Sequence, residues 1–288
     1  MEYTDFKTKN DEKIFSLVNH RVDNESHVPL LHFDKLEAAG MVKHCFTTRA
    51  GGVSENIFST MNLSFTRGDD KDRVMENYRR IASALGERIE SFVCSDQTHT
   101  TNVLRVGKEQ CGIGVTREKP YTDVDGLITD EPGVVLATFY ADCVPLYFVD
   151  TRNKAIGLSH SGWKGTVGRM GQATLQLMAE EFGTNPTDVV AAIGPSICQD
   201  CYEVSEDVAG QFADEFRNHQ HEILINKGKG KYLLDLWKAN EIVLTEAGVK
   251  KDNIAVTNIC TCCNPALLFS HRASQGKRGN LGAFMCLR

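Results

Sequence analysis

The sequence predicts an α/β domain in which helices flank a mixed β-sheet. Two observations lead to this prediction. Short runs rich in β-branched and aromatic residues alternate with longer stretches whose apolar residues recur at helical spacing. No internal repeat, low-complexity tract or linker divides the 288 residues. A chain of this length can bury a large core, so we expect one main domain.

The elements are expected in the following order. Residues 1–29 are polar and are interpreted as an N-terminal extension with one strand pair, and residues 30–288 are expected to form the main domain. Strands are predicted at 91–94, 102–106, 134–140, 145–149, 155–159, 189–193 and 253–259. Helices are predicted from a cap at Asp72 to Gly86, and at 168–182, 205–216 and 235–247. This interleaving of strands and helices favours the α/β class.

The composition of the chain argues against nucleic acid and membranes as binding partners. The net charge of −6 argues against a general nucleic-acid surface, which requires a basic field. The charged N-terminus lacks a signal-peptide apolar stretch, and no run of about 18 apolar residues could span a bilayer. We therefore expect a cytoplasmic protein that acts on small molecules, without a membrane or nucleic-acid partner, as a monomer or homodimer.

Three residues stand where an apolar run ends and a polar or glycine-rich turn begins: His99, Cys143 and His160. Two imidazoles and a thiolate form a zinc ligand set that leaves the fourth position open for water or substrate. No short motif joins the three, so from chemistry alone they could equally be separate core or loop residues.

The segments around these positions resemble a known family. They read, in order, Phe-Thr-Thr-Arg49-Ala-Gly-Gly-Val-Ser, Asp-Gln-Thr-His99, Asp123-Val-Asp125-Gly-Leu-Ile-Thr, Ala-Asp142-Cys143-Val-Pro-Leu, His160-Ser-Gly-Trp-Lys-Gly, Ile-Gly-Pro-Ser-Ile-Cys198 and Phe-Ser-His271-Arg272. Together they are similar to the YfiH-like family, long labelled polyphenol oxidases or laccase-domain proteins and also purine nucleoside phosphorylases. The resemblance covers the chain from about residue 30 onward.

The resemblance implies a fold, a metal and an activity. The fold would be shared in part with cysteine-dependent toxin catalytic domains. The family's zinc ligands fall on His99, Cys143 and His160. The implied activity is phosphorolysis of adenosine, inosine and methylthioadenosine, with adenosine deamination as a side reaction. Nucleoside and phosphate would then be the partners.

Other residues are candidates for catalysis or substrate binding. The turn Gly162-Trp163-Lys164 follows a strand and opens a helix, so its N–H groups could bind an anion, with Trp163 stacking on a purine. A plain tight turn is the alternative. Asp142 could be a general acid or base, or only a turn residue. Arg49 and Asn62 match family segments, and a guanidinium suits phosphate. His271, Arg272 and Arg278 are weaker candidates of the same kind.

Two Cys-x-x-Cys pairs, Cys198/Cys201 and Cys260/Cys263, are separated by 58 residues, and Cys262 lies beside the second pair. A four-thiolate zinc site usually has its pairs about 15–20 residues apart. We therefore expect buried thiols, without a disulfide framework in a reducing cytosol.

The laccase label does not fit a four-copper enzyme, because such enzymes need several His-x-His pairs. This chain has nine histidines, and only His219 and His221 have that spacing. A single Cu²⁺ with weak polyphenol oxidase activity remains an option. Two further alternatives stay open: a hydrolase that edits peptidoglycan precursors, and a metal-free hydrolase using Cys143 with His160.

Overall fold

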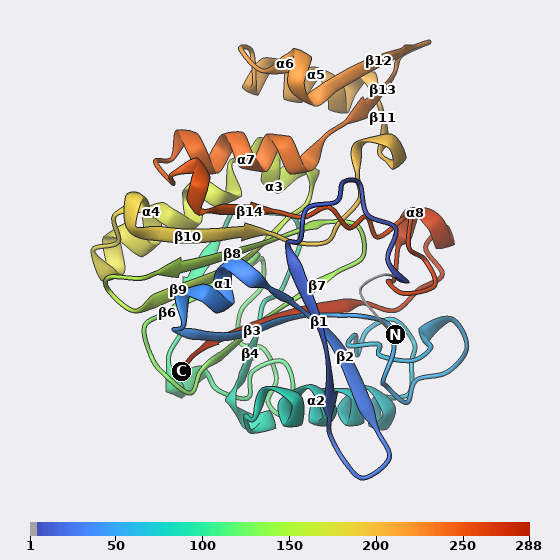
Figure 1. Cartoon of the computed structure of the whole chain (residues 1–288), viewed down its shortest axis with the longest axis vertical. Helices are drawn as coiled ribbons and strands as arrows, with labels where there is room; N and C mark the ends of the chain where they lie inside the picture. The colour runs from blue at the N-terminus through green and yellow to red at the C-terminus, as the bar shows by residue number, and fades with distance from the viewer. Residues whose placement is uncertain (1–4) are drawn as a thin grey trace.

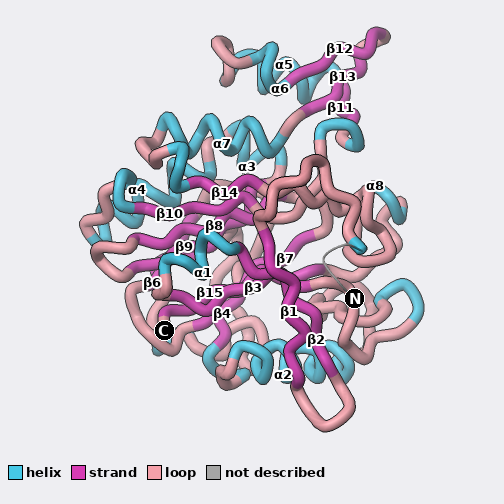
Figure 2. The backbone as a smooth tube through the Cα atoms, in the orientation of Figure 1, coloured by secondary structure: helices cyan, strands magenta, loops and turns pink. Residues whose placement is uncertain are grey.

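Two six-stranded β-sheets pack face to face in the computed structural model, which describes residues 5–288 (Figures 1 and 2). The first sheet has the order β1 (Phe15–Arg21), β2 (His27–Phe33), β3 (Val42–Thr47), β15 (Leu281–Leu287), β7 (Val135–Tyr140) and β4 (Phe92–Cys94). The second has the order β14 (Ile254–Val256), β10 (Val189–Ile193), β8 (Val144–Asp150), β9 (Ala155–Ser161), β6 (Gly126–Thr129) and β5 (Val103–Arg105). Phe46 and Tyr140 of the first sheet share one core with Tyr147 and Leu158 of the second.

Helices cover the outer faces of both sheets (Figure 1). The helix α2 (Lys71–Leu85) packs Val74, Tyr78 and Ile81 on the first sheet. The second sheet is covered by α3 (Trp163–Val167), α4 (Met170–Phe182) and α7 (Leu236–Glu246). A small sheet of β11 (Glu203–Ser205), β13 (Lys231–Leu234) and β12 (Leu224–Gly228) lies beyond α7 with α5 (Glu206–Glu215) and α6 (Gln220–Ile223). Two short helices complete the fold, α1 (Asp34–Ala39) and α8 (His271–Ser274).

The α/β class with mixed sheets flanked by helices is confirmed. Strands β4 and β7, β5 and β6, and β10 and β14 pair in parallel, whereas the other neighbours are antiparallel. All seven predicted strands are present, although the last is cut from 253–259 to Ile254–Val256. Within residues 5–288, no helix combines the length and apolar character needed to cross a membrane.

Two predictions need correction. The cap of α2 is Asp70 rather than Asp72, because the Asp70 carboxylate accepts from the N–H groups of Asp72 and Arg73. The expected strand pair near the N-terminus is present as β1 and β2, but β2 crosses the boundary set at residue 29 and pairs with β3. Residues 15–29 thus belong to the first sheet, and residues 1–4 lie outside the described residues.

One edge of the second sheet gathers the positions of chemical interest. Strand β8 begins where its antiparallel neighbours β9 and β10 end, because Val144 pairs with Ser161 and Leu146 pairs with Ile193. Strand β14 runs parallel to β10 and ends at the same edge. Loops that are distant in sequence therefore meet there.

Candidate active site

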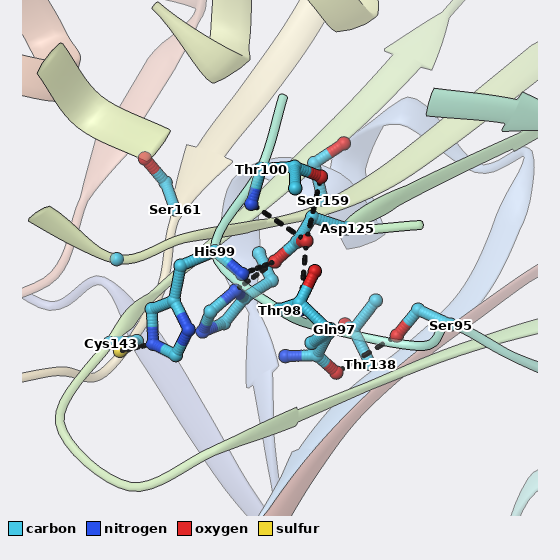
Figure 3. Close-up of polar contacts among 12 residues, drawn as sticks. Ser95, Gln97, Thr98, His99, Thr100, Asp125, Thr138, Cys143, Ser159 and Ser161 are labelled. Atoms are coloured by element: carbon cyan, nitrogen blue, oxygen red, sulfur yellow. Dashed lines mark hydrogen bonds and ion pairs between the residues drawn. The ribbon is translucent and has the colours of Figure 1, made fainter. Parts of the chain in front are cut away.

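His99, Cys143 and His160 meet at this edge. Figure 3 shows the His99 ring beside Cys143. His160 is the penultimate residue of β9, Cys143 directly precedes β8, and His99 lies in the loop between β4 and β5. One ligand atom from each lies within 4.8 Å of the other two. The sequence analysis named the same three residues as a ligand set.

The spacing of this group fits a tetrahedral metal site. The Cys143 Sγ and His99 Nε2 atoms are 3.8 Å apart. Bond lengths of about 2.3 Å to sulfur and about 2.0 Å to nitrogen give roughly 3.6 Å between such ligand atoms in tetrahedral coordination. His160 is buried and His99 is exposed, so the group faces solvent on one side.

Asp125 holds both histidines in place, and it was quoted in a motif but not singled out as a site residue. Its Oδ1 atom accepts from His160 Nδ1 at 2.7 Å and from the backbone N–H of His99 at 3.1 Å. Its Oδ2 atom accepts from the N–H groups of Thr98 and Thr100 (Figure 3). A proton fixed on Nδ1 leaves His160 Nε2 free to bind a metal, the usual carboxylate–histidine arrangement.

The charges of the site favour a thiolate. Burial opposes ionisation of Cys143, but the charge and hydrogen bonding of His160, with help from His99, lower its pKa to about 6. Burial likewise disfavours charged His160, yet the Cys143 charge and the Asp125 hydrogen bond raise the pKa of His160 to about 9. Without a metal, the two groups therefore form a thiolate–imidazolium pair at neutral pH.

Asp142 braces the loop that carries Cys143. Its carboxylate accepts from the Thr261 hydroxyl at 2.6 Å and from the Arg272 backbone N–H at 2.7 Å. Its φ of 91° lies in the left-handed region, which costs energy for a non-glycine residue. Because protein donors contact both carboxylate oxygens, the geometry favours a positioning role over the predicted role in proton transfer.

A cavity of about 350 Å³ opens beside the group. Its wall includes His99, Cys143 and His160. The aromatic residues Tyr78, Phe65 and Phe139 contribute to the wall, and the Phe65 ring stacks on Tyr78 with centroids 5.5 Å apart. The cationic residues are Arg67, Lys119 and Arg278. The volume and the mixed lining are typical of a small-molecule site.

Two guanidinium groups share one acceptor in this cavity. Arg67 Nε donates to Asn280 Oδ1 at 3.2 Å, and Arg278 Nη1 donates to the same oxygen. Burial, together with the nearby charge of Arg67, lowers the pKa of Arg278 to about 10. The Arg278 Nε atom is buried without a hydrogen-bond partner, and neither arginine forms a salt bridge with a carboxylate of residues 5–288. Two neighbouring guanidinium groups that form no salt bridge within the described residues suit an anionic ligand.

The structure places other predicted substrate residues elsewhere. Arg49 does not line this cavity, because its guanidinium donates to the carbonyls of Ser59 and Pro265 and stacks on Phe269. Asn62 is fully buried, and its amide joins Ser64, Asp69 and Asn280. These contacts favour structural roles for both residues.

Of the three residues predicted in the glycine-rich turn, one lies beside the ligand group and two lie away from the cavity. Gly162 adjoins the ligand group, since a Cβ atom there would lie 2.6 Å from His99 Cδ2 and 3.3 Å from Cys143 Sγ. Trp163 packs against the core of the second sheet, and the exposed Lys164 lies over its ring. Neither lines the cavity. Of the three, only the glycine is next to the ligands.

Among the weaker candidates, only Arg278 reaches the cavity. The Arg272 side chain donates to the carbonyls of Cys201 and Glu203. His271 is exposed and does not line the cavity. The sequence analysis did not identify Arg67, because no motif marks it. Arg67 lies near Arg278 because both side chains donate to Asn280 Oδ1.

Comparisons with known proteins identify the family of this chain. Residues 43–288 match the family described as multi-copper polyphenol oxidoreductase laccase. The chain is 38% identical over 240 residues to purine nucleoside phosphorylase YlmD of Geobacillus stearothermophilus, covering 83% of this chain and 88% of the relative. It is 34% identical over 247 residues to adenosine deaminase RL5 from an unknown prokaryotic organism, covering 84% and 94%.

The fold has a solved counterpart. The crystal structure of Bacillus licheniformis hypothetical protein YfiH superposes with a TM-score of 0.84 at 32% identity, covering 93% of this chain and 99% of that one. By sequence and by structure, the chain belongs to the YfiH-like family of laccase-domain proteins.

Proposed function

We propose that this protein is a zinc-dependent purine nucleoside phosphorylase acting on adenosine, inosine and methylthioadenosine, with adenosine deamination as a side activity. The observation that carries the proposal is one cavity containing both the His99–Cys143–His160 group and the arginine pair of Arg67 and Arg278. The names of the relatives, a phosphorylase and a deaminase, support it.

The lining of the cavity suits the two substrates. Phosphate, a dianion, would bind the guanidinium groups of Arg67 and Arg278, whose donors match its oxygens. The flat purine would lie against Phe65 and Phe139, which offer aromatic surface in the same wall. Phosphorolysis breaks the bond between ribose C1′ and the purine nitrogen while a phosphate oxygen bonds to C1′. The arginines would hold that oxygen near the sugar.

The ligand group would supply the remaining chemistry. A zinc ion bound there acts as a Lewis acid, which polarises a substrate oxygen or lowers the pKa of a water molecule. Asp125 keeps the proton on His160 Nδ1, so Nε2 stays available as a ligand. The open side of the group faces the cavity, which is where a purine ring would present C6 for deamination. With Cu²⁺ in place of zinc, weak polyphenol oxidation is the expected minor activity.

A second candidate function has its own observation. The Cys143 thiolate, the His160 imidazolium and Asp125 form a Cys–His–Asp series, which suits a metal-free hydrolase. Chelation separates the two proposals. Removal of the metal abolishes phosphorolysis in the first, whereas it leaves hydrolysis intact in the second.

The direct experiment measures products from adenosine with and without phosphate. We expect ribose 1-phosphate and adenine only when phosphate is present, together with a small phosphate-independent yield of inosine. Adenine release that does not depend on phosphate would mean hydrolysis and would contradict the proposal.

The phosphate KM of variants at Arg278 and Arg49 tests which arginine binds phosphate. Arg278→Ala should raise the phosphate KM about 10- to 150-fold, because a charge-assisted hydrogen bond contributes about 1.5–3 kcal/mol. Arg278→Lys should recover only part of the loss, since a point charge does not reproduce the planar fork. Arg49→Ala is the matched control and should leave the phosphate KM unchanged in the folded variant. The opposite result would restore the role predicted for Arg49 from sequence.

A further inference from the structure

Four cysteines from two distant segments meet on the same sheet edge. Cys198 and Cys201 follow β10, and Cys260 and Cys263 follow β14. Their four Sγ atoms all lie within 4.8 Å of one another. The sequence analysis expected separate buried thiols because 58 residues intervene. Those residues form the small third sheet and α7, after which β14 returns beside β10 in parallel.

The spacing of the sulfur atoms matches metal coordination. Four ligands at the usual Zn–S length of about 2.3 Å give S–S distances of about 3.8 Å in a tetrahedron. Cys201 Sγ and Cys263 Sγ are 3.5 Å apart, and the remaining separations stay below 4.8 Å. All four cysteines are free thiols.

Backbone donors are aimed at one of these sulfur atoms. Cys260 Sγ accepts from the N–H groups of Cys198 at 3.2 Å and Cys263 at 3.4 Å. Such hydrogen bonds stabilise a thiolate and fix its orientation, as outer partners do for metal ligands. Cys198 and Cys260 are buried, whereas Cys201 and Cys263 are partly buried, so the group is closed on most sides.

We propose that Cys198, Cys201, Cys260 and Cys263 bind a second zinc ion in a structural site. Four thiolates complete the tetrahedron and leave no position for water or substrate, so this ion would have no catalytic role. A closed set of four sulfur ligands suits zinc or iron, and zinc needs no redox partner.

The second zinc would stabilise the loop that braces the candidate active site. Cys260 and Ser196 form a β-bridge, and the next residue, Thr261, donates its hydroxyl to Asp142 beside Cys143. On the other pair, the Cys201 carbonyl accepts from the Arg272 side chain, whose backbone N–H also binds Asp142. Both halves of the cysteine group therefore contact partners of Asp142.

Zinc counting on the full chain tests the proposal. After dialysis against zinc and removal of excess, the wild-type protein should bind about two zinc ions per chain, one closed and one open site. Cys201→Ser should lose one of them, His99→Ala should lose the other, and the double variant should lose both. Cys262→Ser is the matched control: Cys262 lies between two of the ligands in sequence but is outside the group, so the count should stay at two.

A second measurement, cobalt absorption, does not need a cysteine variant that could fail to fold. Cobalt substituted for zinc should give strong thiolate-to-metal charge-transfer absorption, and this should persist in His99→Ala, which retains the four-thiolate group. The result is independent of the proposed activity, because it is read from metal content and absorption alone.

Three results would overturn the proposal. The first is wild-type protein that takes up only the zinc lost in His99→Ala. The second is a native disulfide between Cys201 and Cys263 found by mass spectrometry. The third is a second zinc that disappears in His44→Gln but not in Cys201→Ser, since His32, Glu37 and His44 form another group with ligand spacing.

Discussion

Two groups of sulfur-containing ligands occupy the same edge of the second sheet, and they differ in openness. The group of His99, Cys143 and His160 combines three donors and borders a cavity of about 350 Å³. The group of four cysteines has a complete donor set and is braced by backbone N–H groups. The number of protein ligands separates the two, because three leave a position for chemistry and four do not.

The two groups also differ in the charge of the residues that hydrogen-bond to their ligands. Asp125, a buried carboxylate, orients the His160 imidazole and holds the His99 backbone N–H, and its charge would balance that of a metal in the open group. The closed group is supported by neutral backbone N–H groups, since four zinc-bound thiolates would already bring excess negative charge. One sheet edge can thus support two kinds of site according to which residues follow each strand.

The largest expected effect comes from the open group. Cys143→Ala removes one of three ligands, so zinc at that site and phosphorolysis should be lost together. Lewis-acid stabilisation contributes several kcal/mol, which corresponds to a loss of activity of about a thousandfold or more. Activity assays and elemental analysis check this. If Cys143→Ala retained full activity, the open group would not be the catalytic site.

The next largest expected effect is the pH dependence of Cys143 alkylation. In metal-free protein its pKa of about 6 makes about half of the thiol reactive at pH 6, against about one part in a thousand at the ordinary pKa of 9.0. Because thiols lose their proton as pH rises, alkylation should increase between pH 5 and 7 and then level off. Mass spectrometry can follow Cys143 beside Cys111, whose burial raises its pKa and which should react only at higher pH.

A variant of Asp125 tests whether its charge supports the open group. Asp125→Asn keeps the shape but removes the charge behind His160, so zinc affinity at the open group should fall about 10- to 100-fold. Competition with a chelator measures it. Asp123→Asn is the control in the same loop, since the Asp123 carboxylate accepts from the exposed Thr98 hydroxyl and, within residues 5–288, forms no hydrogen bond with the three ligands. Equal losses in both variants would mean that the loop, rather than the Asp125 charge, matters.

The smallest effect concerns the space around the open group. Gly162→Ala would place a methyl group 2.6 Å from His99 Cδ2, so the His99 ring must move and zinc affinity should fall by about a few-fold, below the Asp125→Asn effect. Gly210→Ala, in α5 with open space around its Cα, should have no effect on zinc binding. Zinc titration of the two folded variants compares them. Unchanged affinity in Gly162→Ala would show that His99 tolerates displacement.

The sequence predicted what depends on local pattern. Apolar residues at Val74, Tyr78, Ile81 and Leu85 recur at helical spacing, and α2 buries all four. The strands around Cys143 and His160 were also predictable, because buried β-branched and aromatic runs end at polar turns. His99, Cys143 and His160 were named together from their positions at the ends of apolar runs and their ligand chemistry, and the family resemblance strengthened that prediction.

What the sequence could not supply was the meeting of distant segments. Arg278 approaches Arg67 only because both contact Asn280, and no local signal records that contact. The pairs at Cys198 and Cys260 meet because β14 pairs with β10, which a rule based on the spacing between pairs cannot detect. Arg49 was expected to bind phosphate from its motif, yet backbone carbonyls occupy its guanidinium.

The position of β15 has a consequence for how the protein is made. β15 lies between β3 and β7, and Gly282 N–H donates to Thr47 Oγ1 across 235 residues of sequence. At a synthesis rate of about 5–20 residues per second, β3 waits roughly 10–50 s for this neighbour. During that time the ribosome carries a nascent chain with two unpaired strand edges, which are sites where chains can aggregate. Because Cys143 follows β7, the open ligand group takes its final shape only after Leu281–Leu287 have been translated and have paired with β7.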